Sequence, residues 1–321
     1  MATSKSKKTK KSTEKPKTTN SKSEVTVVEE VVTVAEPTTV EEKTVEEAKE
    51  IKVKGAKKND NPFAGFFARK SDPNENILTI FRNHRIWGAI LGELIGTMFM
   101  TALLLTLGIY QPLYIFFGII GITMAVYGLS GAHLNPALTA GMMATRRISA
   151  IRGVLYMVAQ VVGAWLALVV INAFRMAGET KVDLPAMTPV EMTTLWKLIG
   201  IEFFGVFTVA FFFNRAQEYK TARSALTYSV LVAGGITLAV LFAIVISSNF
   251  FKLNNNFILN PAVAIMYQIF PTSAENFGTL ISKVGLETLV YILTPIVAGV
   301  IGFFVADAAK SLAAECEEEK K

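Results

Sequence analysis

Two Asn-Pro-Ala triplets, Asn135-Pro136-Ala137 and Asn260-Pro261-Ala262, occupy matching places in two sets of three apolar segments. Asn is a favoured N-cap residue, because its side-chain oxygen accepts a hydrogen bond from a free N–H group of the first helical turn. Proline suits the first helical position, since its φ is already helical and its missing N–H would have no partner there. Each triplet therefore predicts the start of a helix. The apolar runs that follow, 137–144 and 262–270, are about half as long as a bilayer span.

The N-terminal ends of two such half-helices would make a selective barrier if they met at the middle of a membrane. Each helix dipole is equivalent to about half a positive charge at its N-terminus, so two facing ends repel cations. Capping leaves the side-chain amides of Asn135 and Asn260 free to donate hydrogen bonds to water or to a neutral hydroxyl group. One triplet alone is an ordinary helix start, whereas two in matched settings indicate a pore for uncharged solutes.

The segments that must position these triplets are strongly apolar. The chain has 321 residues, of which 51% are hydrophobic, and its mean hydropathy is +0.42. Crossing a hydrocarbon core takes about 20 helical residues. Six stretches are long enough: 86–109, 112–130, 151–174, 195–214, 225–247 and 285–306. Backbone polar groups in lipid must be satisfied within their own segment, so we expect an all-α membrane protein with six transmembrane helices and two re-entrant half-helices.

The two halves of the chain indicate an inverted repeat, because three spans per half make the second copy enter the membrane from the opposite side. The first span of each half carries a carboxylate three residues before a glycine, in Glu93-Leu-Ile-Gly96 and in Glu202-Phe-Phe-Gly205. We therefore predict a six-span channel domain over 76–308, between a charged tail over 1–75 and an acidic tail over 309–321.

Intramembrane carboxylates are costly and commonly functional. The segments that enter the half-helices present backbone N–H groups without helical partners, so we assign Glu93 and Glu202 a scaffold role as acceptors, with a proton relay as the alternative. Gln160 is expected to serve a similar polar purpose. We interpret His133 as a hydrogen-bonding loop residue, since no second His or Cys lies near it as a metal ligand. The sequence has no nucleophile paired with a base, no phosphate loop and no dinucleotide motif, so we expect no enzymatic activity, no metal and no cofactor.

Charge outside the spans predicts the orientation of the chain. Positive residues gather on one side of the expected bilayer: Arg82, Arg85, Arg146, Arg147, Arg152, Arg215, Lys220 and Arg223. This bias predicts that both termini are cytoplasmic. Residues 1–24 hold eight Lys and two Glu (+6), and residues 25–50 hold eight Glu and two Lys (−6). Such blocks predict a disordered tail, and the alternative is a basic segment that binds anionic lipid or nucleic acid.

Three patterns together resemble the major intrinsic protein family of aquaporins and glycerol facilitators. These patterns are Ser130-Gly-Ala-His-Leu-Asn-Pro-Ala-Leu-Thr139, the triplet Asn260-Pro261-Ala262, and Glu93-x-x-x-Thr97. The resemblance covers residues 86–307. It implies a passive channel in a cell membrane for water or small uncharged solutes, assembled as a homotetramer in which each protomer has its own pore.

The resemblance also implies a second constriction, formed by Ile115, Ser248, Phe257 and Val263, with Phe117 as the alternative to Ile115. Val263 stands where relatives have an arginine, and Ala264 stands where many glycerol facilitators have an aspartate. Replacing a guanidinium by an isopropyl group removes five donors and a charge, so we expect a wider, more apolar opening that admits glycerol. A water-selective channel is the first alternative. A membrane scaffold with a vestigial pore is the alternative from another class.

Overall fold

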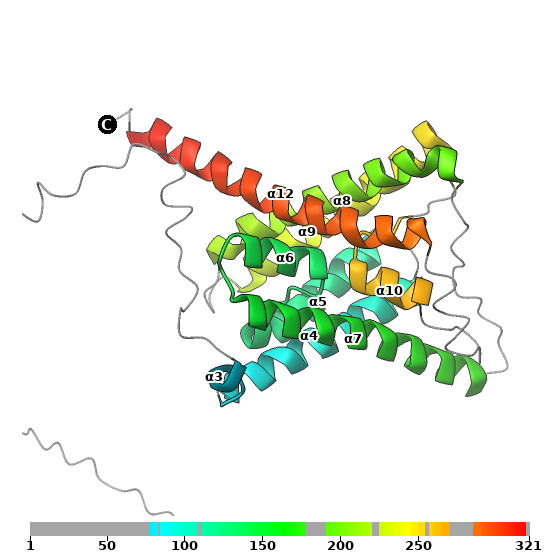
Figure 1. Cartoon of the computed structure of the whole chain (residues 1–321), viewed down its shortest axis with the longest axis horizontal. Helices are drawn as coiled ribbons and strands as arrows, with labels where there is room; N and C mark the ends of the chain where they lie inside the picture. Colours follow the sequence, from blue (N-terminus) through cyan, green and yellow to red (C-terminus); the bar gives the residue numbers. More distant parts are fainter. Residues whose placement is uncertain are drawn as a thin grey trace, which may run out of the picture. The chain divides into compact units, whose positions relative to one another are not determined.

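Six long apolar helices make up most of the described part of the chain (Figure 1). The computed structural model describes residues 77–82, 84–107, 111–177, 191–219, 225–253, 257–269 and 285–318. All of these belong to one unit, Asn59–Lys321. The predicted tail over 1–75 lies outside the described residues. Within the described residues every regular element is helical, as the sequence predicted.

The helices begin and end close to the predicted boundaries. The long helices are α4 (His84–Leu107), α5 (Pro112–Ser130), α7 (Ala150–Ala177), α8 (Leu195–Ala216), α9 (Ala225–Val245) and α12 (Leu286–Glu318). The short ones are α3 (Ile77–Arg82), α6 (Pro136–Ala144), α10 (Pro261–Ile269), the 3₁₀ turns Met192–Thr194 and Gln217–Tyr219, and the π-helical turn Ile246–Phe251. Helix α12 continues past residue 306, because the segment that follows is rich in the strong helix formers Ala, Leu, Lys and Glu.

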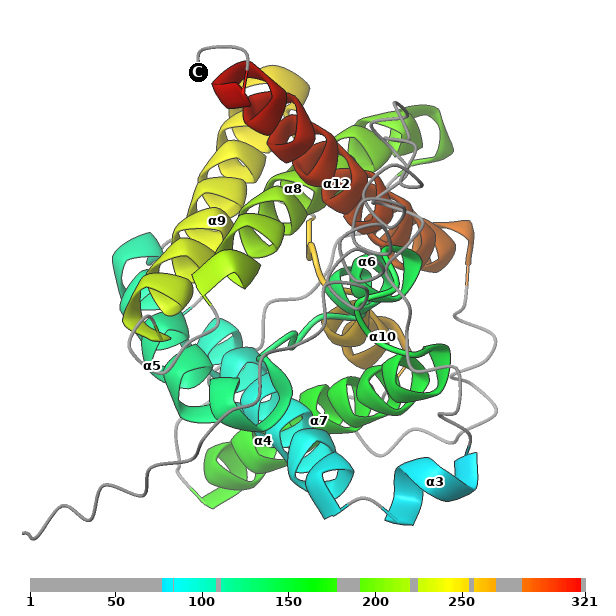
Figure 2. The same ribbon diagram turned by 90° about the vertical axis from the view of Figure 1, so that its left-hand side faces the viewer.

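The two halves of the unit repeat one packing pattern. Helix α4 packs mainly on α7 and α5, and its counterpart α8 packs mainly on α12 and α9. The short helices cross between the halves, since α6 lies chiefly against α12 while α10 contacts both α7 and α12. Figure 2 shows α6 and α10 with the six long helices around them. The long helices thus form a frame that holds two short helices in its interior.

Apolar side chains cover the outside of this frame as well as its core. Large hydrophobic residues on the long helices are exposed, among them Trp87, Phe117, Val158, Phe204, Phe242 and Leu293. Within the described ranges, six helices are long and apolar enough to cross a membrane. An apolar exterior of this extent suits lipid rather than water, and it agrees with the predicted multi-pass membrane protein.

Glycines allow the two strongest helix pairs to approach closely. A Cβ atom on Gly163 of α7 would collide with the backbone carbonyl oxygen of Leu94 on α4. In the other half, a Cβ atom on Gly302 of α12 would lie 3.0 Å from the carbonyl oxygen of Phe207 on α8. Small residues drive helix association in membranes because they bring backbones together. The same device therefore serves the corresponding helix pair in each half.

We predict that Gly163→Ala destabilises the protein by about 1–3 kcal/mol, because the added methyl group must push α7 away from the α4 backbone. The measurement is the thermal unfolding midpoint of the purified protein in detergent. Gly121→Ala is the matched control, since a Cβ atom at Gly121 meets no atom within 4 Å. Equal midpoints for the parent and Gly163→Ala would show that α4 and α7 are not in close backbone contact.

Candidate pore

Each short helix begins at its Asn-Pro-Ala triplet, with the asparagine as the N-cap. The Asn135 side-chain oxygen accepts a hydrogen bond from the Ala137 N–H at 2.9 Å, and Asn135 itself is extended, with φ −153° and ψ 123°. The Asn260 oxygen accepts from the Ala262 N–H at 3.0 Å. Proline occupies the first position of α6 and of α10. Both triplets therefore start helices by the same local chemistry.

The two asparagines also bind each other's loops. The Asn135 amide nitrogen donates to the Leu259 carbonyl oxygen at 2.9 Å, and the Asn260 amide nitrogen donates to the Leu134 carbonyl oxygen at 2.9 Å. Each amide has two N–H groups, so one N–H of each asparagine is already used. We expected capping to leave both N–H groups of each asparagine amide free to donate. Only one N–H of each is left, because the other binds a carbonyl oxygen of the opposite loop.

Two buried carboxylates hold the loops that precede the asparagines. Glu93 of α4 accepts hydrogen bonds from the N–H groups of His133 at 2.9 Å and of Leu134 at 2.7 Å. Glu202 of α8 accepts from the N–H groups of Ile258 at 2.6 Å and of Leu259 at 3.0 Å. Both carboxylates are fully buried. Each loop therefore has its orphan donors satisfied by the first long helix of its own half.

A leucine before each asparagine takes an unusual backbone conformation that the sequence analysis missed. Leu134 has φ 53° and Leu259 has φ 58°, in the left-handed region that residues with a side chain seldom occupy. Room for these side chains comes from two glycines, since a Cβ atom on Gly96 or on Gly205 would collide with Leu134 or Leu259 respectively. The repeated Leu-Asn-Pro-Ala and Glu-x-x-Gly patterns were the available signal.

The first half carries an additional polar network. Gln160 of α7 donates to the Glu93 carboxylate at 2.7 Å and to the Thr139 hydroxyl oxygen at 3.0 Å. The His133 ring nitrogen Nδ1 lies 3.2 Å from the same hydroxyl, and Thr139 in turn donates to the Asn135 carbonyl oxygen at 3.1 Å. The structure thus brings Glu93, Gln160 and His133 together beside the first triplet. The residue that corresponds to Thr139 in the second half is Ala264, which has no polar side chain.

The four residues assigned to a second constriction lie in different parts of the core. Ile115 packs in a cluster from α4, α5, α9 and the first loop, Phe257 packs against α8 and α9, and Val263 packs against α4 and α7. Ser248 is half-buried in the π-helical turn that follows α9. Phe117, the alternative to Ile115, is 62% exposed on the outer face of α5. A joint constriction of Ile115, Ser248, Phe257 and Val263 stays a prediction.

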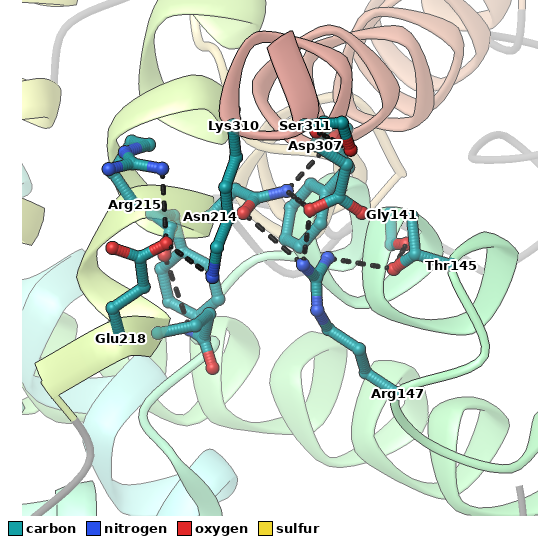
Figure 3. Close-up of polar contacts among 12 residues, drawn as sticks. Gly141, Thr145, Arg147, Asn214, Arg215, Glu218, Asp307, Lys310 and Ser311 are labelled. Atoms are coloured by element: carbon teal, nitrogen blue, oxygen red, sulfur yellow. Dashed lines mark hydrogen bonds and ion pairs between the residues drawn. The ribbon is translucent and has the colours of Figure 1, made fainter. Parts of the chain in front are cut away.

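An ion pair fastens the C-terminal end of α6 to α8 and α12 (Figure 3). Arg147 donates to the Asp307 carboxylate at 2.6 Å, to the Asn214 side-chain oxygen at 3.3 Å and to the Thr145 hydroxyl at 3.0 Å. Thr145 is the C-cap of α6, and a cation near a helix C-terminus is favourable. In the sequence Arg147 indicated only the orientation, and Asn214 and Asp307 could not be predicted as its partners, because their separation in the chain follows no periodic pattern.

Comparison with known proteins identifies one family. The sequence profile of the Major intrinsic protein (MIP) family matches residues 80–306. Probable aquaporin PIP2-8 of Arabidopsis thaliana is 32% identical over 99 residues, which cover 30% of this chain and 36% of that protein. Aquaporin PIP2-7 of Musa acuminata is 26% identical over 176 residues, which cover 48% and 62%. This chain thus spans about a third of the length of the Arabidopsis relative.

A solved structure confirms the predicted fold class. The structure is similar to the X-ray structure of the aquaglyceroporin from Plasmodium falciparum, with a TM-score of 0.51 and 19% sequence identity. The match covers 69% of this chain and 96% of that chain. At this identity the likeness speaks for the fold alone.

We predict that Glu93→Leu destabilises the protein more than Glu93→Gln does. Leucine leaves the His133 and Leu134 N–H groups buried and unpaired, at a cost of about 1–3 kcal/mol each, whereas glutamine retains one acceptor oxygen. The readouts are the unfolding midpoint in detergent and the folded fraction in size-exclusion chromatography. If leucine were tolerated as well as glutamine, the carboxylate would not be the anchor of the first loop.

Proposed function

Because this chain belongs to the major intrinsic protein family, we propose that it is a passive transmembrane channel for water and small neutral solutes such as glycerol. The observation that carries the proposal is the reciprocal contact between Asn135 and the Leu259 carbonyl and between Asn260 and the Leu134 carbonyl. It brings the N-termini of α6 and α10 together inside the helical frame. A solute that passes this point meets the positive ends of two helix dipoles.

In the proposed channel, solutes are selected by the amide N–H groups of Asn135 and Asn260 that are not used between the two loops. Asn135 is 7% exposed and Asn260 is 5% exposed, and each keeps one amide N–H that is not used in the cross-contact. These two donors would bind the oxygen of water or of an alcohol group during passage. A cation gains nothing from donors and is repelled by the dipole ends, so the proposed channel conducts uncharged molecules downhill and needs no cofactor.

Val263 favours solutes larger than water as substrates. Its side chain is apolar and 3% exposed, so this position supplies neither a charge nor hydrogen-bond donors to a permeating molecule. Phe257 offers an apolar ring beside which the carbon chain of a polyol can pass. Water alone is the second candidate, because the relatives from Arabidopsis thaliana and Musa acuminata are named aquaporins.

The charges of the described residues support an orientation in the membrane. Arg147, Arg215 and Lys310 lie at one end of the bundle, where Arg147 pairs with Asp307 while Arg215 and Lys310 share Glu218 (Figure 3). By the positive-inside rule this end faces the cytoplasm. We propose a multi-pass protein of the cell membrane with both termini cytoplasmic, assembled as a homotetramer. Its basic N-terminal block is proposed to rest on anionic lipid.

We predict that proteoliposomes containing the parent shrink faster than empty vesicles under a sucrose gradient, and re-swell faster after the initial shrinkage in a glycerol gradient, as measured by stopped-flow light scattering. Asn135→Ala and Asn260→Ala should each lower the permeability, since each removes a donor and a cap that contributes about 1 kcal/mol. Size-exclusion chromatography must show that the variants assemble. A double variant that assembles and conducts like the parent would refute the role of the amides, and a scaffold without a working pore would match empty vesicles.

We predict that Val263→Arg raises the ratio of water to glycerol permeability, because a guanidinium at this position would narrow and charge the proposed opening. Val263→Met is the matched control, since it lengthens the side chain without adding charge or donors. Correct assembly must be checked first, because position 263 packs among apolar residues of α4 and α7. An assembled Val263→Arg variant with the solute ratio of the parent would show that position 263 does not face the pore.

A further inference from the structure

Tyr228, in the first turn of α9, binds the start of the loop that leads to Asn135. Its hydroxyl donates to the Gly131 carbonyl oxygen at 2.6 Å, a short hydrogen bond between residues far apart in the sequence. Gln217, in the 3₁₀ turn after α8, donates its amide N–H to the same hydroxyl at 3.3 Å. Gly131 has φ 90°, so the backbone turns sharply at the residue that Tyr228 holds. The tyrosine thus joins the start of α9 and the end of α8 to the first loop.

Aromatic rings surround this hydrogen bond. The Tyr228 ring lies 4.6 Å from the ring of Tyr127 on α5 and 6.0 Å from the ring of Phe213 on α8, measured between centroids. Phe213 also packs edge-on against His133 at 5.5 Å. Tyr228 and Phe213 are both fully buried. These contacts pack the Tyr228 ring between α5, α8 and the first loop.

Polar atoms without partners lie on the same segments. The Ser229 hydroxyl and the Gln217 side-chain oxygen are buried and have no hydrogen-bond partner within the described part of the chain. One turn beyond Ser229, Ala233 packs in the cluster that contains Leu134 of the first loop. A buried polar atom without a hydrogen bond costs free energy unless a mobile partner such as a permeating molecule visits it. Two buried polar atoms without partners thus lie on the segments that hold Tyr228.

We propose that Tyr228 is the gate residue of the pore at its Gly131 end, and that its ring and hydroxyl limit the size of the solutes that pass. This inference rests on the proposed channel function. In the structure the Tyr228 hydroxyl donates a hydrogen bond to the Gly131 carbonyl oxygen. This bond holds the Tyr228 ring against the rings of Tyr127 and Phe213. Solute passes when this hydrogen bond opens and the ring turns aside, which makes the Gly131 carbonyl available as an acceptor. The gate is separate from the asparagine pair and from position 263.

Permeability measurements on two tyrosine variants test this gate. Tyr228→Phe removes the hydroxyl and keeps the ring, and we expect glycerol permeability to rise about fivefold, the change that corresponds to one hydrogen bond of ordinary net strength. Tyr228→Ala also removes the ring, and we expect it to admit polyols longer than glycerol. Tyr156→Phe is the matched control, because the buried Tyr156 donates to the neighbouring Ser130 carbonyl at 3.4 Å from α7.

The outcomes distinguish the gate from the channel function. Faster glycerol flux in Tyr228→Phe, with Tyr156→Phe unchanged from the parent, supports the gate. If the parent conducts and an assembled Tyr228→Phe variant conducts identically, the gate is refuted while the channel function stands. Equal acceleration by both Phe variants refutes a specific role for Tyr228. If neither the parent nor any variant exceeds empty vesicles, the channel function and the gate both fall.

Discussion

The exchange of hydrogen bonds between Asn135 and Leu259 and between Asn260 and Leu134 is the constraint on which the rest of the fold depends. Two short helices can present their N-termini to each other inside an apolar frame only if every polar group of the connecting loops is satisfied. The asparagine oxygens accept from the first helical turns, and the asparagine amides donate to the opposite carbonyls. Glu93 and Glu202 accept from the N–H groups of the two residues before each asparagine. The long helices α4 and α8 position these two carboxylates beside the loops.

The two halves satisfy the polar groups of their loops with corresponding residues, but they differ in the additional hydrogen bonds that hold each loop. Each half has a carboxylate, a glycine that makes room for a leucine, and a leucine in the left-handed conformation. The first half adds Gln160 and Thr139, and Tyr228 also binds its loop at Gly131. The loop before Asn135 is therefore held near both of its ends.

Features with a local or periodic cause were predictable from the sequence. The spans follow from apolar length, the short helices from the Asn-Pro signals, and the positions of Glu93 and Glu202 from the repeat. Contacts between distant segments were not predictable, because the Tyr228–Gly131 and Arg147–Asp307 pairs join residues whose spacing follows no helical period. The second constriction was carried over by resemblance, and packing places three of its four members, Ile115, Phe257 and Val263, in three separate clusters, a relation that spacing along the chain does not encode.

The reciprocal contact also orders events during synthesis. Asn135 emerges from the ribosome well before its partner Leu259, so the amide of the first asparagine and the carbonyl of Leu134 have no native partners until the fifth long helix has been inserted. Neither half can form all the hydrogen bonds of its own loop without the other half. These long-range pairs can close only after the second loop has been made, so they form late in assembly.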